Sequence, residues 1–179
     1  MLILAASLFA VISVWQIDSE SNQTQPEPMS EFIFTSLLDD NQWKNTANLR
    51  FADVDGDGAE EVMLAEPFSG NVLILDECPD CKVISNLSDG LEMPVRSQYI
   101  DLNDDGLGDY LISDMGSVYP STELVGRVVL MKNDGEGGFE AVVLLDNVGR
   151  VTCAEAADLD GDDDLDIVVC EFEIGRAHV

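Results

Sequence analysis

Residues 156–169 read AADLDGDDDLDIVV, and this stretch decides the fold. Two further stretches align with it without gaps, FADVDGDGAEEVML at residues 51–64 and YIDLNDDGLGDYLI at residues 99–112. Each copy has apolar residues, then the pattern D-x-[DN]-x-D-x-x-x-[DE], then an apolar run. Three copies in one chain indicate a repeat architecture, so the fold is predicted from the repeating unit.

The length of the unit is visible in the positions of the first aspartate of each copy. Asp53, Asp101 and Asp158 are separated by 48 and then 57 residues. Almost all of the extra length lies around Met115–Val125, a segment rich in Ser, Pro, Thr and Gly. Such a composition is typical of a surface loop that lengthens between parts of constant length.

Short β-rich runs separated by Gly, Asn, Asp or Pro fill each unit, and beyond the N-terminal apolar segment none sustains a helical period. Units of about 50 residues with roughly four strands match propeller blades. We therefore expect an all-β fold, a partial β-propeller of about two to three four-stranded blades with calcium-binding loops between strands. A β-sandwich or a β-solenoid is the alternative. The expected strands are residues 62–65, 72–75, 97–100, 110–112, 128–131, 141–145, 151–154 and 167–170.

The acidic loop has the composition of a calcium site. Alternate residues such as Asp101, Asn103 and Asp105 direct side-chain oxygens into one concavity, position seven adds a backbone carbonyl, and position nine adds a carboxylate. Six or more oxygen ligands suit Ca²⁺ better than Mg²⁺ or Zn²⁺. Position six needs a left-handed turn, which Gly58 and Gly106 allow and which Asp tolerates better than most residues in the third copy.

Two other interpretations of the loop were weighed. An EF-hand requires a bidentate Glu at position twelve, where this chain has Leu64, Ile112 and Val169, so EF-hands are excluded. Asx-rich turns without metal are the second alternative. Three copies in register, each with four ligand-type side chains, favour calcium over that alternative.

The loop and its flanking apolar strands resemble the FG-GAP/VCBS repeat family, the blades of integrin-α-like β-propellers, over about residues 48–172. Residues 157–162 (ADLDGD) followed by 165–169 (LDIVV) are typical of bacterial members. The resemblance implies about three calcium ions and a closed propeller of about seven blades, more than this chain supplies. With the carbonyls of position seven, the expected ligands are Asp53, Asp55, Asp57, Ala59 and Glu61; Asp101, Asn103, Asp105, Leu107 and Asp109; and Asp158, Asp160, Asp162, Asp164 and Asp166.

The charge of the chain limits its partners. With 36 Asp and Glu against 8 Lys and Arg, the formal net charge is −28, which excludes nucleic acid and anionic lipid surfaces as partners. The three loops hold 15 of the 36 acidic residues, which favours metal binding over a generally solvated acidic surface.

The two ends of the chain differ from the repeats. Residues 1–17 are predicted to be a signal peptide or membrane anchor, with a buried helix as the alternative, and residues 18–30 a flexible linker before the incomplete repeat domain at 31–172. Residues 173–179 (EIGRAHV) back-translate to GAG ATC GGA AGA GCA CAC GTC, which resembles a sequencing adapter. We therefore expect an artefactual tail on a truncated chain, and no role for His178, the single histidine.

The four cysteines form two candidate pairs. Cys78 and Cys81 make a C-x-x-C, for which a small disulfide or free thiols are the open alternatives. If the third loop joins antiparallel strands, paired residue numbers sum to about 323. Cys153 and Cys170 then face each other, as a disulfide or as small core residues.

A catalytic site is not expected. Without a histidine before the tail no Ser-His-Asp or Cys-His set can form, calcium accounts for the paired carboxylates, and no phosphate-binding loop is present. The sequence predicts a non-catalytic, extracytoplasmic propeller (secreted, periplasmic or surface-tethered) for binding, adhesion or scaffolding, with an unknown protein or carbohydrate ligand and a possible N-terminal membrane tether. The alternative is an accessory propeller of a larger secreted enzyme; a cytoplasmic calcium buffer is a third, weaker possibility. The segment 115–125, with Tyr119 and Pro120 at its middle, is the candidate recognition loop.

Overall fold

The structure is a computed structural model, and it describes residues 45–77, 81–120 and 122–172. Within these ranges the chain is all-β. The predicted signal or anchor segment, the linker and the C-terminal tail lie outside the described residues. Within the described part of the chain, no helix has the length and apolar character needed to cross a membrane.

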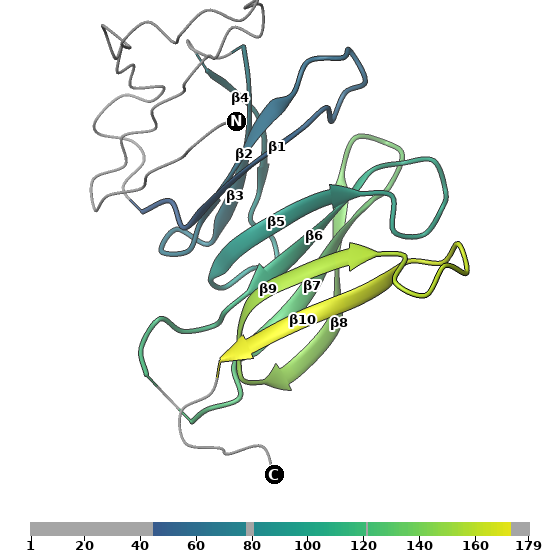
Figure 1. Ribbon diagram of the computed structural model, residues 1–179. Helices are drawn as coiled ribbons and strands as arrows, with labels where there is room; N and C mark the ends of the chain where they lie inside the picture. Colours follow the sequence, from purple (N-terminus) through teal and green to yellow (C-terminus); the bar gives the residue numbers. More distant parts are fainter. Residues whose placement is uncertain (1–44, 78–80, 121, 173–179) are drawn as a thin grey trace, which may run out of the picture.

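Ten antiparallel strands form three sheets (Figure 1). Sheet 1 has the order β1-β2-β3-β4, sheet 2 has the order β5-β6-β7-β8, and β9 and β10 form a two-stranded hairpin. Neighbours in each sheet are consecutive in sequence, so each four-stranded sheet is an antiparallel meander. The strands are β1 Asn48–Ala52, β2 Glu61–Glu66, β3 Asn71–Asp76, β4 Lys82–Leu87, β5 Pro94–Ile100, β6 Asp109–Asp114, β7 Gly126–Asn133, β8 Phe139–Val148, β9 Arg150–Ala157 and β10 Asp166–Phe172.

All eight predicted strands are present, each extended by a few residues at its ends. The prediction missed β1, a short strand before the first acidic loop, and β4, whose residues are mostly exposed and polar in part. Both strands lie at sheet edges, where one backbone side has no partner and the apolar pattern is weak.

Sheets 1 and 2 pack face to face through alternate side chains. Along β2, Met63 and Ala65 face sheet 2, where Tyr110 and Ile112 of β6 meet them. The period of two in a strand sends the intervening Val62 and Leu64 to the opposite face of sheet 1. The fully apolar runs of β2 and β6 are therefore explained by burial on both faces.

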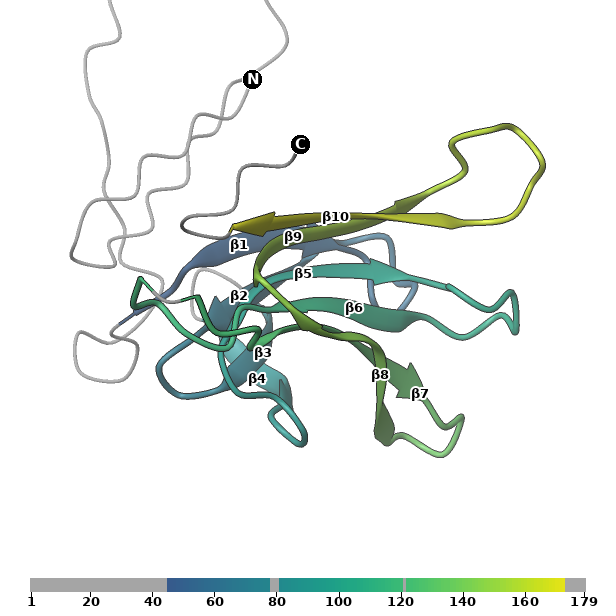
Figure 2. The same ribbon diagram turned by 90° about the horizontal axis from the view of Figure 1, so that it is seen from below.

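The hairpin β9–β10 packs on the other face of sheet 2. Leu111 and Val128 of sheet 2 contact Val151, Ala154 and Ala156 of β9. Strand β9 lies against β5, β6 and β7, as β5 lies against β1 and β2 (Figure 2). The hairpin therefore packs on sheet 2 in the same way as sheet 2 packs on sheet 1.

Polar side chains join the first strands of the three units. Glu155 of β9 accepts hydrogen bonds from Arg50 of β1 and Arg96 of β5. The Gln98 side chain on β5 pairs with β9 as a strand backbone would, donating to the Ala156 carbonyl (3.0 Å) and accepting from its N–H (2.7 Å). The first strands thus contact one another through side chains and not through a backbone ladder.

The predicted insertion is a loop whose middle part is held by a buried arginine. Arg150, 6% exposed, donates to the carbonyls of Val118 (3.4 Å) and Tyr119 (3.3 Å), and its guanidinium lies 4.7 Å from the centre of the Phe172 ring. Tyr119 itself is 74% exposed. The loop is therefore anchored at its backbone and presents an aromatic side chain to solvent.

The cysteine predictions have different outcomes. Cys153 and Cys170 are paired across the hairpin, as the sum of 323 predicts, and both thiols are free. Cys81 is disulfide-bonded. Its predicted partner Cys78 lies outside the described residues.

Candidate metal centre

The three acidic loops occupy equivalent places in the fold. Loop 1 (residues 53–61) joins β1 to β2, loop 2 (101–109) joins β5 to β6, and loop 3 (158–166) joins β9 to β10. All three project from the same end of the strands (Figure 1). The sequence repeat is therefore also a repeat in space.

Two left-handed residues give each loop its shape. Position six is left-handed in all copies, as predicted, at Gly58 (φ 90°), Gly106 (φ 82°) and Asp163 (φ 71°). Position four, which holds Gly56, Asp104 and Gly161, is left-handed too. This feature was not predicted from the sequence. Loops 2 and 3 thus each place one aspartate in a conformation that favours glycine.

The first aspartate organises the backbone of each loop. Both oxygens of Asp53 accept backbone N–H groups, from Gly56 (2.7 Å) and Gly58 (3.0 Å). Loop 3 repeats this arrangement at positions four and six of the loop, and in loop 2 the amides belong to positions five and six. The turn therefore depends on a carboxylate at position one as well as on the left-handed residues.

Position five has a second constant role. Its side-chain oxygen accepts the N–H of position seven in every loop, from Ala59 to Asp57 (2.7 Å), from Leu107 to Asp105 (2.9 Å) and from Asp164 to Asp162 (3.0 Å). These Asx turns need no metal, so the folded loop agrees with both interpretations that the sequence left open.

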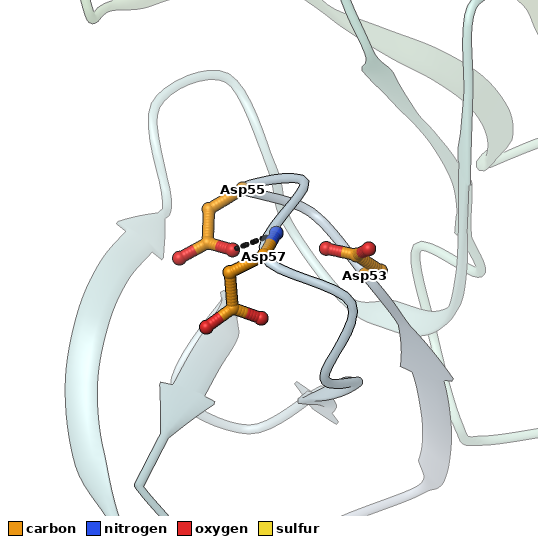
Figure 3. Close-up of side chains that lie close together, drawn as sticks. All are labelled: Asp53, Asp55 and Asp57. Atoms are coloured by element: carbon orange, nitrogen blue, oxygen red, sulfur yellow. Dashed lines mark hydrogen bonds between the residues drawn. The ribbon is translucent and has the colours of Figure 1, made fainter.

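The structure brings some of the predicted ligands together. Carboxylate oxygens of Asp53, Asp55 and Asp57 lie within 4.8 Å of one another in loop 1, as Figure 3 shows, and those of Asp158, Asp160 and Asp166 do so in loop 3. Loop 2 has the amide of Asn103 at its third position, and its four carboxylates, Asp101, Asp104, Asp105 and Asp109, do not form such a close group of three. Glu61 and Asp162 lie outside the close groups of loops 1 and 3.

Position nine differs between the loops. Glu61 and Asp166 each accept the N–H of position two in their own loop, from Val54 (2.7 Å) and Leu159 (3.2 Å). Asp109 instead accepts the N–H of Asn133 on β7 through Oδ1 (2.8 Å). Its other oxygen, Oδ2, has no hydrogen-bond partner, although the residue is completely buried.

A buried carboxylate oxygen without a donor costs about 1–3 kcal/mol or more. A cation coordinated by loop 2 would supply the missing partner of Asp109 Oδ2. The side chains at positions one, three, five and nine of loop 2 offer carboxylate and amide oxygens, which are the ligands of hard cations such as Ca²⁺. The residues present therefore fit a calcium ion.

Tyr99 of β5 links loops 1 and 2. Its hydroxyl donates to the Val54 carbonyl of loop 1 (3.0 Å), and its ring covers loop 2 so closely that a Cβ on Gly108 would lie 2.0 Å from it. Burial, followed by the charges of Asp53, Asp109, Asp101 and Glu61, raises the pKa of the Tyr99 phenol. The shift shows that the carboxylates of both loops act on the same group.

A second repeated acid was missed from the sequence. Glu66, Asp114 and Glu171 each follow the first loop aspartate by 13 residues, at the end of the strand after the loop. Asp114 accepts the N–H groups of Glu92 (3.0 Å) and Met93 (2.5 Å), just before β5, and Glu171 accepts the N–H of Gly149 (3.0 Å), just before β9. Extending the aligned copies by two residues would have revealed it.

Comparison with known proteins identifies the repeat. Residues 101–169, from the start of loop 2 to the strand after loop 3, match the family model described as an FG-GAP-like repeat. Residues 101–169 are therefore assigned to the FG-GAP-like repeats. No curated protein and no solved structure matches it significantly. FG-GAP repeats form a non-catalytic structural repeat family whose members often bind calcium.

Proposed function

We propose that this chain is a non-catalytic, calcium-stabilised β-propeller module that acts outside the cytoplasm in binding, adhesion or scaffolding. The observation that carries the calcium part is the buried, partnerless Oδ2 of Asp109 within a loop whose geometry recurs three times. Each loop holds one ion, so the described chain binds three.

Five oxygen donors per loop are proposed as ligands. They come from the side chains at positions one, three, five and nine and from the carbonyl at position seven. The ion neutralises carboxylates that otherwise repel one another at distances of about 4–5 Å, by about 4 kcal/mol per pair at a partly shielded site. Calcium is thus proposed to stabilise the fold and not to act in a reaction.

The interpretation of the sheets as propeller blades follows from the way each unit packs on the preceding one, which is the same for sheet 2 and for the hairpin. Sheets 1 and 2 are two four-stranded blades, and β9 with β10 begins a third. Strands β1, β5 and β9, which Arg50, Arg96 and Glu155 connect, are the innermost strands of their blades. A propeller closes with further blades of the same kind.

The binding role is assigned to the loop at residues 115–125. It is the longest departure from the repeat, Arg150 holds its backbone at Val118 and Tyr119, and it exposes the Tyr119 side chain. Exposed aromatic side chains on a rigid base are favoured at protein and carbohydrate interfaces. An accessory role beside a catalytic domain is the alternative, and a gene that encodes a histidine-containing catalytic domain next to these repeats would favour it.

The calcium proposal is tested by thermal unfolding in calcium and in chelator. At tenfold saturation each site adds about 1.4 kcal/mol to the free energy of unfolding, so three sites add about 4 kcal/mol. Absence of any shift in the unfolding temperature at millimolar calcium would overturn the metal assignment.

A pair of variants in loop 2 assigns the ion to its ligands. Asp109→Asn keeps an oxygen for the Asn133 N–H but replaces the partnerless Oδ2 with an amide NH₂. We expect calcium affinity at one site to fall at least about tenfold, since one charged ligand is lost. Asp104→Asn is the matched control, because it removes the same charge from the same loop at position four, which supplies no ligand. Equal calorimetric titration curves for the two variants would contradict the assignment.

A further inference from the structure

Two free thiols face each other across the third hairpin. Cys153 on β9 and Cys170 on β10 are direct partners in the antiparallel register, four residue pairs away from loop 3. Directly opposite residues of an antiparallel pair point to the same face, so the two side chains are neighbours.

The local backbone suits a bond between them. Directly opposite residues in an antiparallel pair have Cβ atoms about 4.5–5.5 Å apart, and a disulfide needs about 3.5–4.5 Å. The register shifts between Cys170 and Glu171, so a β-bulge lies next to the pair. A bulge bends and twists its strand locally, which allows the small approach that the bond requires.

The two thiols differ in accessibility. Cys170 is exposed, whereas Cys153 is half-buried. Burial raises the pKa of the Cys153 thiol, and the nearby Arg96 guanidinium lowers it in part. An oxidant from solution therefore meets Cys170 first, and Cys153 is placed to complete the reaction.

We propose that Cys153 and Cys170 form a cross-strand disulfide by exchange with a small-molecule disulfide, and that this bond orders loop 3. The Cys170 thiolate, after losing its proton to solvent, attacks one sulfur of the oxidant RSSR, which forms a mixed disulfide and releases one RS⁻. The Cys153 thiolate then attacks the Cys170 sulfur and releases the second RS⁻. Two cysteines are oxidised, and one RSSR is reduced to two thiols.

The hairpin is the unit that gains most from such a bond. It has two strands within the described chain, whereas sheets 1 and 2 have four each. A two-stranded hairpin is marginally stable by itself, and the bond closes a ring that contains the whole of loop 3. Fewer open conformations of the hairpin then compete with the ordered loop.

A coupling to calcium follows, and it rests on the proposed function. If the disulfide orders loop 3, it strengthens calcium binding there, and by linkage calcium strengthens the disulfide by the same factor. Calcium should therefore shift the exchange equilibrium with glutathione toward the bridged form by about fivefold or more. Asp158→Asn, which disables loop 3, should abolish the shift, and Asp53→Asn in loop 1 should leave it unchanged.

Bond formation is tested with the full chain in buffers of reduced and oxidised glutathione, followed by alkylation and peptide mass mapping. The expected result is a linked pair of peptides that contain Cys153 and Cys170. In Cys153→Ser, which cannot complete the exchange, the expected product is a stable mixed disulfide of glutathione on Cys170. Full alkylation of both native thiols in oxidised glutathione would overturn the proposal.

The two proposals fail in different ways. A linked pair whose equilibrium ignores calcium, in a chain that calcium also fails to stabilise against heat, refutes the metal sites and the coupling but supports the bond. A calcium-stabilised chain whose thiols stay free refutes the bond and leaves the propeller proposal intact. A linked pair unaffected by calcium in a calcium-stabilised chain refutes the ordering of loop 3.

Discussion

The left-handed backbone of the acidic loops shows how much a single residue decides. Positions four and six both have positive φ in all three copies, but each of loops 2 and 3 fills one of them with aspartate. Loop 1, with Gly56 and Gly58, has neither penalty, and a Cβ at either glycine would meet no atom within 4 Å. The cost at Asp104 and Asp163 is therefore one of backbone conformation and not of crowding.

Replacing Asp163 with glycine should stabilise the third hairpin. We expect Asp163→Gly to raise the free energy of unfolding in chelator by about 0.5 kcal/mol relative to Asp163→Asn, because glycine has no penalty at φ 71° while its greater freedom in the unfolded chain offsets part of the gain. Asparagine is the control, since it removes the same charge and keeps a side chain. Urea denaturation measures both, and an asparagine variant as stable as the glycine variant would contradict the backbone account.

At the scale of elements, the sequence predicted what depends on local pattern. The eight runs with β-rich composition are strands, and the sum of 323 gives the register of β9 with β10. Edge strands β1 and β4 were missed because exposure weakens their apolar pattern. The contacts of Glu155 with Arg50 and Arg96 could not be predicted, since they depend on how the sheets pack. For the loops, the left-handed turn at position six was predictable, whereas the different hydrogen-bond partners of Asp109 and Glu61 were not.

The repeated acid at the end of β2 and β6 should respond to substitution with opposite signs. Asp114 accepts two amides and pairs with Arg127, so Asp114→Asn should lower the free energy of unfolding by about 3 kcal/mol. Asp114 lies opposite Arg127 on the next strand, but the equivalent Glu66 lies opposite the uncharged Asn71. Glu66 accepts a hydrogen bond from the Ser69 hydroxyl (3.0 Å). Burial raises the pKa of Glu66, and the Ser69 hydrogen bond lowers it in part.

The pH dependence of the free energy of unfolding tests whether the ionised Glu66 destabilises the fold. Because the folded-state pKa of Glu66 is raised, its ionisation destabilises the fold, and stability is lost as the pH rises through that pKa. Glu66→Gln should therefore be more stable than the wild type at pH 7, and the gain should vanish below the ordinary glutamate pKa near 4.5. Denaturation across this pH range measures it. A Glu66→Gln variant that is less stable at pH 7 would refute the assignment.

At the scale of the molecule, the net charge of −28 makes repulsion between carboxylates a term in the stability of the fold. Arg50 and Arg96 lie where sheets meet, at Glu155, and Arg127 pairs with Asp114 across neighbouring strands of sheet 2. Within the described residues, no ion pair joins a carboxylate of the acidic loops to an arginine or lysine, so these carboxylates repel one another at the same end of the strands. Salt and calcium should relieve this repulsion to different extents.

Sodium chloride should therefore stabilise the chelated protein more than the calcium-loaded one. Raising its concentration from about 0.05 M to about 0.5 M shortens the screening length from about 14 Å to about 4 Å, which weakens repulsion between loops. In chelator we expect the unfolding temperature to rise by several degrees, and in saturating calcium by less than half as much, because the ions have already neutralised the loops. Scanning calorimetry at both salt concentrations measures the difference. Potassium chloride should reproduce the effect, since screening depends on ionic strength and not on the identity of a monovalent cation. An equal rise with and without calcium would show that the repulsion lies elsewhere on the surface and that calcium does not neutralise the loops.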